Sequence, residues 1–503
     1  MFQKITQFFR ENKSLTYIIL FGLVLRLIFT LVVAPVYFNR ANIFVDGDTG
    51  AWTRAIQNLI HYGELNFLKP GNDITAYSRM PGYSFFLAPS FLIVTLFYKI
   101  QGLDIHNYSA IWDVALKLTA YTQIILDTIS IFLVFYIAKR LFSNYKIGII
   151  SAFLYATYPF VIVWNPVCYS EIPSIFFALL ALALALKGDK KYILAIAGIS
   201  LGFAVLNRPQ YALLAPFVIF LFYQKYKGFT KESAFQALIF YVFFTITYGS
   251  WPLRNYIRFG KVVTTQDLSG ISNWNQEVIA FMQYVYSVKA EWDPQFSNII
   301  HNKPVKFPPI AYRTPEDSIK LERAIYLSQN CGSGFSYWKG YWKNPIPAND
   351  PSNCSAEAAQ LFNELRANQI KYNSVNFYIT IPLQNLKKAL FKSELSDSKS
   401  LVQKLGGMLF YYRTFLLMLG IIGLVMMLRD RFTIPIAMLI GSFFVALYFY
   451  LSFGTSPQCR NIEMRYLLQP DVLMLLPAAF LLSKLRFLDT FLNKFTSTVS
   501  TSK

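Results

Sequence analysis

Acidic and basic side chains carry the clearest chemical signal in this sequence. Asp46 and Asp48 form an Asp-Gly-Asp triplet, and Glu171 stands at the start of an apolar run. A carboxylate can accept the proton of an attacking hydroxyl, or orient an amine, when it lies within hydrogen-bond reach. Guanidinium groups stay charged and match phosphate oxygens, and the candidates are Arg79, Arg208, Arg254, Arg460 and Arg465, with Asn255 next to Arg254. This inventory suits a phosphorylated substrate.

These side chains can act together only if the fold brings them to one place. Of the 503 residues, 54% are apolar and 15% are charged, whereas soluble proteins carry about 25% charged residues. Apolar runs of roughly 17–22 residues recur, long enough to cross a bilayer. Such segments must be helical, because other structures leave backbone polar groups unpaired in lipid. The sequence therefore predicts an all-α polytopic membrane protein.

Loop charge predicts the topology. Lys4, Arg10 and Lys13 are expected to hold the segment before the first span in the cytoplasm, because basic residues cluster in cytoplasmic loops. Charge and alternation agree with about ten spans and both termini cytoplasmic, near 15–35, 118–141, 147–164, 172–186, 192–206, 211–222, 235–251, 408–428, 434–451 and 467–485. This scheme places the acids and arginines named above on the outer face.

The spans divide the chain into three predicted domains. Residues 1–253 form an N-terminal transmembrane module with a first outer loop at 36–117, residues 254–404 form an outer domain, and residues 405–503 hold the last helices. The apolar run 85–98 breaks the alternation, so we expect it to lie in the outer interface or to dip in and back. The outer domain is expected to be of mixed structure, with an amphipathic stretch at 356–391.

Charge and cysteine usage narrow the class further. The net charge is +20, but the basic residues lie in short loops between apolar runs, which argues against nucleic-acid binding. The four cysteines fit no metal-ligand spacing. Cys331 and Cys354 both fall in the polar segment, where they form a disulfide if it faces an oxidising compartment, or else remain two thiols.

Two charges are predicted inside spans, where ionisable residues are costly and need partners. Arg26 lies about eleven residues from the start of the first span, and Asp127 about nine residues into the second. Both positions are close to mid-depth in a core about 30 Å thick. We therefore predict a structural salt bridge between Arg26 and Asp127, without a catalytic role.

Several stretches resemble known proteins. FVDGDTGAWTRAIQNLIHYGELNF followed by SRMPGYSFFLAP resembles the first outer loop of integral-membrane glycosyltransferases with the C-type fold, with Asp48 as the acid and Trp52 as the aromatic, where the family more often has Tyr. Later stretches resemble that family in the same order: YPFVIVWNPVCYSEIPSIFF, GISLGFAVLNRPQYALLAP, WPLRNYIRFGKVVTTQDLSG and RYLLQPDVLMLLPA. The match runs from about residue 23 to 270, resumes near 465 and leaves the polar segment uncovered.

The resemblance, which is greatest to protein O-mannosyltransferases and the lipid A aminoarabinose transferase, implies a function. It implies inverting transfer of a hexose or pentose from a polyprenyl-phosphate donor to a glycolipid, glycan or protein. The expected membrane is a cell inner membrane, with the site facing the periplasm or exterior. Asp48 is the candidate base, Glu171 a second catalytic acid that orients the acceptor or pairs with an arginine, and the candidate substrate contacts are Arg79, Tyr83, Arg208, Arg254, Asn255 and Arg465.

Each of these roles has a structural alternative. Asp48 could only cap the helix that starts at Thr49, and each arginine could be an interfacial anchor. No metal or other cofactor is expected to be required, although Asp46, Asp48 and Glu171 are an alternative divalent-cation set, as in oligosaccharyltransferases of the same fold. The competing functions are a lipid-linked polysaccharide polymerase or ligase, a secondary transporter and a non-catalytic lipid-binding scaffold.

Overall fold

The computed structural model describes residues 7, 11–38, 42–188, 190–268, 274–341, 351–391, 401–455, 459–460 and 462–485. The chain forms two compact units: unit 1 comprises residues 1–265, 393–447 and 464–503, and unit 2 comprises 266–392 and 448–463. All regular structure in the described ranges is helical, so the predicted all-α class is confirmed.

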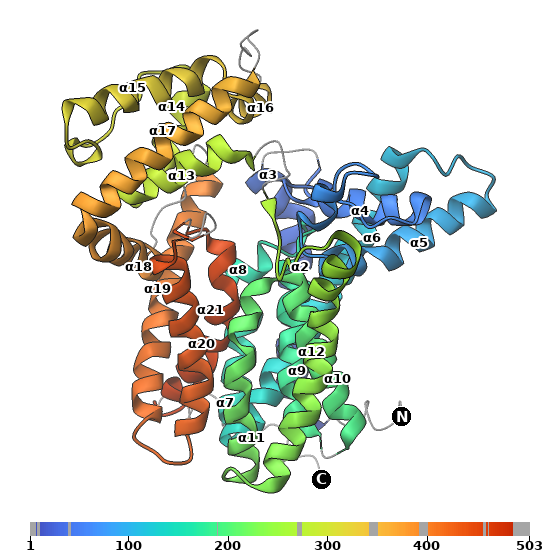
Figure 1. The fold of residues 1–503 in the computed structure, drawn as a ribbon. Helices are drawn as coiled ribbons and strands as arrows, with labels where there is room; N and C mark the ends of the chain where they lie inside the picture. Colours follow the sequence, from blue (N-terminus) through green and yellow to red (C-terminus); the bar gives the residue numbers. More distant parts are fainter. Residues whose placement is uncertain are drawn as a thin grey trace. The chain divides into compact units, whose positions relative to one another are not determined.

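Unit 1 is built on long apolar helices (Figure 1). In chain order its elements are α2 (Lys13–Ile28), η1 (Phe29–Val33), α3 (Ala34–Phe38), α4 (Thr49–Tyr62), η2 (Asp73–Tyr77), α5 (Gly82–Ile100), α6 (Tyr108–Phe142), α7 (Tyr145–Ala156), α8 (Pro159–Ile162), α9 (Glu171–Lys187), α10 (Lys191–Asn207), η3 (Pro209–Leu213), η4 (Ala215–Val218), α11 (Ile219–Tyr226), α12 (Lys231–Phe259), α19 (Leu401–Met427), α20 (Ile434–Phe453) and α21 (Met464–Leu482). Residues 448–453 of α20 are counted with unit 2.

Six described helical segments are long and apolar enough to cross a membrane: Lys13–Phe38, Gly82–Ile100, Lys231–Phe259, Lys404–Met427, Ile434–Phe453 and Met464–Leu482. The protein is therefore a multi-pass membrane protein. The expected count of ten spans stays a prediction. The expected span 211–222 is not one helix: it passes through the short turns η3 and η4, which have Pro209 and Pro216 in their first two positions, before α11 begins. Proline lacks the N–H that a continuous helix needs.

Small residues allow α10 and α12 to pack closely. Gly198 and Gly202 are one helical turn apart on α10, and a Cβ at either position would clash with the backbone or side chains of α12 at Phe240 and Thr247. Close backbone approach through small residues four apart is the usual way that membrane helices associate. This contact fixes the end of α10, where Arg208 follows.

Helix α5 contains the apolar run 85–98. It packs against α4, α6 and α10, and in Figure 1 its axis lies across those of α9, α10 and α12. The expected position in the outer interface stays a prediction, and the length and composition of α5 also suit a crossing.

The predicted Arg26–Asp127 salt bridge is present. The Nε atom of Arg26 lies 2.5 Å from Oδ2 of Asp127, and both side chains are fully buried. Tyr155 and Asn165 also donate hydrogen bonds to the Asp127 carboxylate, and Arg26 donates to the carbonyl of Ala156. The pair therefore joins α2, α6 and α7, as expected of a structural ion pair.

A second buried ion pair, Arg413–Asp471, was not predicted from the sequence. Arg413 of α19 donates to Asp471 of α21 through Nε at 2.6 Å and Nη2 at 3.3 Å. Tyr158 donates to the same carboxylate at 3.1 Å. Both charges lie inside apolar runs, so the cost of an unpaired charge in lipid could have identified them too.

Unit 2 consists of amphipathic helices α13 (Gln276–Val288), α14 (Asp293–Ile300), α15 (Pro315–Asn330), α16 (Ser333–Tyr341), α17 (Pro351–Tyr372) and α18 (Ile381–Phe391), with the short turns η7 (Pro309–Ala311) and η8 (Asn376–Thr380). The expected mixed structure is wrong for the described residues, which contain no strand. Asn and Pro residues start helices here: Asn275 caps α13, and Pro315 stands in the first turn of α15. Phe281, Tyr284 and Phe362 form the centre of its core.

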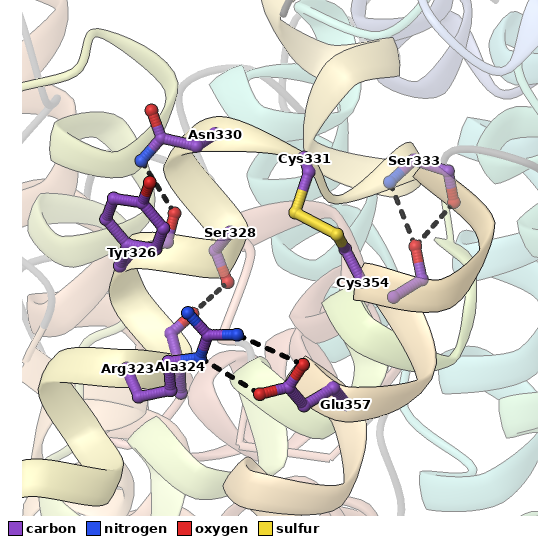
Figure 2. The surroundings of a disulfide bond; sticks show 10 residues. Arg323, Ala324, Tyr326, Ser328, Asn330, Cys331, Ser333, Cys354 and Glu357 are labelled. Atoms are coloured by element: carbon purple, nitrogen blue, oxygen red, sulfur yellow. Dashed lines mark hydrogen bonds and ion pairs between the residues drawn. A yellow bond between two sulfur atoms is a disulfide. The ribbon is translucent and has the colours of Figure 1, made fainter. Parts of the chain in front are cut away.

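Cys331 and Cys354 form a disulfide, one of the two states considered from the sequence (Figure 2). It joins the end of α15 to the first turn of α17. The Arg323–Glu357 ion pair, at 2.9 Å, links the same two helices, and the backbone N–H of Ser333 donates to the Ser355 hydroxyl. The remaining cysteines, Cys168 and Cys459, are buried thiols.

Replacing Cys331 and Cys354 with Ser is expected to lower the free energy of unfolding of unit 2 by about 3 kcal/mol, because the disulfide closes a loop of 23 residues. Thermal unfolding in detergent measures the change. Dithiothreitol should lower the melting temperature of the wild type but not of the double variant. Equal melting temperatures for the oxidised wild type and the double variant would contradict this.

Candidate active site

Asp48 is the N-cap residue of α4, directly before its first residue Thr49, but its side chain makes no capping hydrogen bond. Instead, its carboxylate lies between two guanidinium groups. Oδ1 is 2.8 Å from Nη2 of Arg79, and Oδ2 is 2.9 Å from Nη1 of Arg465. The structure therefore favours an electrostatic role over the helix-capping alternative.

The two arginines determine the charge state of Asp48. Burial by itself would raise the pKa of the Asp48 carboxyl, but Arg79 and Arg465 outweigh it and hold that pKa well below its usual range. A lowered pKa stabilises the fold above the unfolded-state value, and this contribution is lost as the pH falls through the folded value. Asp48 is therefore ionised above about pH 4. Its side chain keeps 20% of its surface exposed, so a substrate can reach it.

Aromatic residues hold the start of α4 against the segment before α9. The backbone N–H of Asp48 donates to the Tyr169 hydroxyl at 3.2 Å, and the Thr49 hydroxyl donates to the Cys168 carbonyl at 3.0 Å. Trp52 packs edge-on against Tyr169, and the guanidinium of Arg465 lies over the same ring. Because Tyr169 contacts both Asp48 and Arg465, it positions these two side chains relative to one another.

Glu171 and Arg208 form a second ion pair beside the first. Glu171 is the first residue of α9 and is fully buried, and Arg208 follows α10. The ring of Tyr466 lies under the guanidinium groups of both Arg208 and Arg465. The charge of Arg208 also lowers the pKa of Asp48, so the two ion pairs act on one another.

The turn that carries Arg79 is tied to the end of α10. The first residue of α5, Gly82, touches the backbone of Leu206 and Asn207, and a Cβ there would clash. This contact explains the glycine in the Arg-Met-Pro-Gly-Tyr sequence and brings Arg79 near Arg208. Three arginines and two acids thus gather at the ends of helices, which leaves one positive charge in excess.

The comparisons with known proteins agree with this architecture. Residues 109–251 match the family model described as dolichyl-phosphate-mannose-protein mannosyltransferase. The chain also aligns over 98% of its length with the archaeal oligosaccharyltransferase of Archaeoglobus fulgidus, solved with an inhibitory peptide and a dolichol-phosphate, at a TM-score of 0.50 and 14% identity. The chain has the fold of an integral-membrane glycosyltransferase. The resemblance drawn from the sequence is thereby confirmed.

The chain spans only about half of the archaeal protein, 53% of its length. A further match, with a TM-score of 0.35 and 12% identity, is to ArnT of Cupriavidus metallidurans bound to undecaprenyl phosphate; it covers 85% of this chain and 76% of that one. No curated protein sequence matches the chain.

Within this glycosyltransferase fold, three of the predicted substrate contacts, Arg254, Asn255 and Tyr83, make their hydrogen bonds outside the Asp48 cluster. Arg254 donates to the carbonyls of Ala76 and Leu65 at 3.0 and 3.1 Å and to the Asn255 side chain at 2.8 Å. Asn255 in turn donates to the Val263 carbonyl. Arg254 therefore holds the segment that precedes Arg79.

Tyr83 likewise directs its hydrogen bond to a residue other than Asp48 and its arginines. It is fully buried, and its hydroxyl donates to Gln123 at 2.7 Å. Gln123 in turn donates to the carbonyls of Asn165 and Val167. These contacts make Tyr83 a support for the segment before Tyr169.

Asp46, Asp48 and Glu171, the alternative cation set, are not grouped as metal ligands in the described structure. No three His, Cys, Asp or Glu side chains among the described residues lie close enough to hold a metal ion. Both carboxylate oxygens of Asp48 face arginines, Glu171 pairs with Arg208, and Asp46 accepts the N–H of Gly47 within its turn.

Two residues of the cluster were missed as individual candidates, namely Tyr169 and Tyr466. Each lies in a stretch that carried the resemblance: Tyr169 two residues before Glu171, and Tyr466 directly after Arg465. Their position beside charged candidates was the available signal. The contact between their rings and guanidinium groups exists only in the folded chain.

Proposed function

We propose that this protein transfers a hexose or pentose from a polyprenyl-phosphate donor to a glycolipid, glycan or protein acceptor, with inversion at the anomeric carbon. The observation that supports this most is the partly exposed Asp48 carboxylate between Arg79 and Arg465. The archaeal protein of similar fold was solved with a dolichol-phosphate and a peptide. That complex supports the proposal that a lipid phosphate and an acceptor bind to the same protein here.

The proposed reaction uses the cluster as follows. The acceptor oxygen attacks the anomeric carbon, the bond from that carbon to the phosphate oxygen breaks, and its electron pair leaves with the lipid phosphate. The acceptor proton passes to Asp48. Arg79, Arg208 and Arg465 meet the phosphate charge, since guanidinium forks match phosphate oxygens. As these arginines turn to the phosphate, they release Asp48, so its pKa rises toward a range useful for a base.

The proposed location is a cell inner membrane, with both termini in the cytoplasm and the site on the outer side. The Cys331–Cys354 disulfide lies in the stretch between α12 and α19. Disulfides persist in oxidising compartments, which supports placing that stretch outside the cytoplasm. The proposed reaction needs no metal.

Turnover tests this function. Purified protein in proteoliposomes receives labelled polyprenyl-phosphate sugars and a panel of acceptors, and released polyprenyl phosphate is measured. Arg465→Ala should lower the rate by about 10²-fold or more, because it removes charge where the leaving group develops it, whereas the exposed Lys117→Ala control should not. A chelator should leave the rate unchanged.

Other outcomes would replace the proposal. Solute flux without sugar transfer would favour a transporter, and transfer of only preassembled chains would favour a polymerase or ligase. Binding of lipid-linked donors without any turnover would indicate a scaffold. Activity lost with chelator and restored by a divalent cation would overturn the metal-independent reaction.

A further inference from the structure

Two arginines of unit 2 lie at one small cavity without a carboxylate partner. Arg460 follows α20, and Arg366 belongs to α17. Within the described part of the chain, neither makes an ion pair with an acidic residue. Buried or half-buried arginines are normally paired, so the positive charge here lacks its usual counterpart.

Arg460 is nearly fully buried, at 3% exposure. It donates three hydrogen bonds, all to neutral carbonyls: Nε to Gly454 at 3.1 Å, Nη1 to Tyr286 at 2.8 Å and Nη2 to Phe377 at 3.0 Å. A guanidinium has five N–H donors, so these bonds leave two unused. Carbonyls also leave the positive charge uncompensated.

The backbone of Arg460 is unusual as well. Its φ of +67° lies in the left-handed region that residues with a Cβ rarely adopt. Such conformations persist only where the surroundings hold them, and they cluster at functional sites. The stacking of Arg460 on the Phe377 ring, at 4.3 Å, helps to hold it.

Arg366 has donors to spare. Its Nε is buried and has no hydrogen-bond partner. Burial lowers the pKa of Arg460 to about 10, and the charge of Arg366 acts in the same direction. The two guanidinium groups therefore repel one another, and an anion between them would relieve that repulsion.

The cavity lined by these groups has room for about one water-sized oxygen, about 10 Å³. Gln283 and Thr455 line it as well and offer an amide and a hydroxyl as further donors. Two positive charges match the charge of about −1.5 to −2 of a phosphate monoester better than the single charge of a carboxylate.

We infer that Arg366 and Arg460 form a phosphate-binding site in unit 2, which holds one oxygen of a phosphate group between two guanidinium groups. The ligand is free inorganic phosphate, a soluble phosphate ester or the phosphate of an anionic lipid headgroup. This site shares no residue with the Asp48 cluster and does not depend on the proposed transfer.

Phenylglyoxal, which modifies accessible guanidinium groups, provides a local test with the full-length protein in nanodiscs. The modification of Arg366 is followed by mass spectrometry with inorganic phosphate or with chloride at equal ionic strength. Phosphate should slow it about tenfold at ten times the dissociation constant, in the wild type and equally in Arg465→Gln. The second variant removes a phosphate contact of the proposed active site, so the two proposals fail separately.

A second measurement covers the whole protein. Phosphate should raise the melting temperature of the Arg465→Gln variant. The double variant Arg465→Gln/Arg366→Gln should show no such increase. The control Arg465→Gln/Lys371→Gln, which removes an exposed charge on the same helix, should show the same increase as Arg465→Gln alone. Protection by phosphatidic acid nanodiscs, but not phosphatidylcholine ones, would identify a lipid headgroup as the source. Three results would overturn the inference: equal rates of Arg366 modification in phosphate and chloride, no reaction of Arg366 at all, or a phosphate-induced increase of the melting temperature that persists when Arg366→Gln is present.

Discussion

Asp48→Asn is expected to lower the rate of sugar transfer by about 10²–10⁴-fold, the usual contribution of a general base. The amide keeps the shape of the carboxylate but cannot take the acceptor proton, and it offers no negative charge to Arg79 and Arg465. The loss should appear in kcat at saturating donor. Radiolabelled sugar transfer in proteoliposomes measures it.

The fold should survive this change. Asp48, Arg79 and Arg465 keep 14–20% of their side-chain surface exposed, so water can partly replace the lost interactions. The expected loss of stability is the contribution that comes from the lowered pKa of Asp48. Asp113→Asn is the matched control, because Asp113 is an exposed acid paired with Lys117 on α6. Wild-type turnover by Asp48→Asn, with donor and acceptor both saturating, would exclude Asp48 as the base.

Asp127→Asn is expected to lower the free energy of unfolding by about 3–5 kcal/mol, because it leaves the Arg26 charge buried without a counter-charge. Nη2 of Arg26 already lacks a hydrogen-bond partner, so the site has little capacity to compensate. Thermal unfolding in detergent, followed by intrinsic fluorescence, measures the loss.

The double variant Arg26→Met/Asp127→Leu is the informative comparison. Replacing a buried pair with apolar residues of similar size is often neutral or stabilising, so the double variant should be more stable than Asp127→Asn. Its transfer rate at low temperature should stay near the wild-type value if the pair is structural. A loss in Asp127→Asn no larger than that in Leu133→Ala on the same helix would refute the structural role.

The buried ion pairs show which contacts can be predicted from the sequence alone. Arg26 and Asp127 could be paired from sequence because lipid forbids lone charges and span lengths set their depth. Arg413 and Asp471 follow the same rule and lie 2.6 Å apart. Depth along a span is a one-dimensional property, which is why this kind of contact is predictable.

The cluster around Asp48 needed more than the sequence. The resemblance named Asp48, Arg79, Arg208 and Arg465, and the structure brings these four together with Glu171. The resemblance alone did not show that Arg254 has a different role: Arg254 donates hydrogen bonds to backbone carbonyls and not to an acid of the cluster. Side-chain direction depends on packing between α4, α5, α10 and α21, and no local pattern encodes it.

The sequence by itself determined a multi-pass, all-helical membrane protein, because long apolar runs admit only helices in lipid. It also determined which ionisable residues had to find partners. Only the tertiary structure decided that the Asp48 side chain lies between two arginines and makes no capping hydrogen bond to α4, and that the regular structure in the described part of the polar segment is helical. Both outcomes depend on contacts between residues far apart in the chain, 417 positions in the case of Asp48 and Arg465.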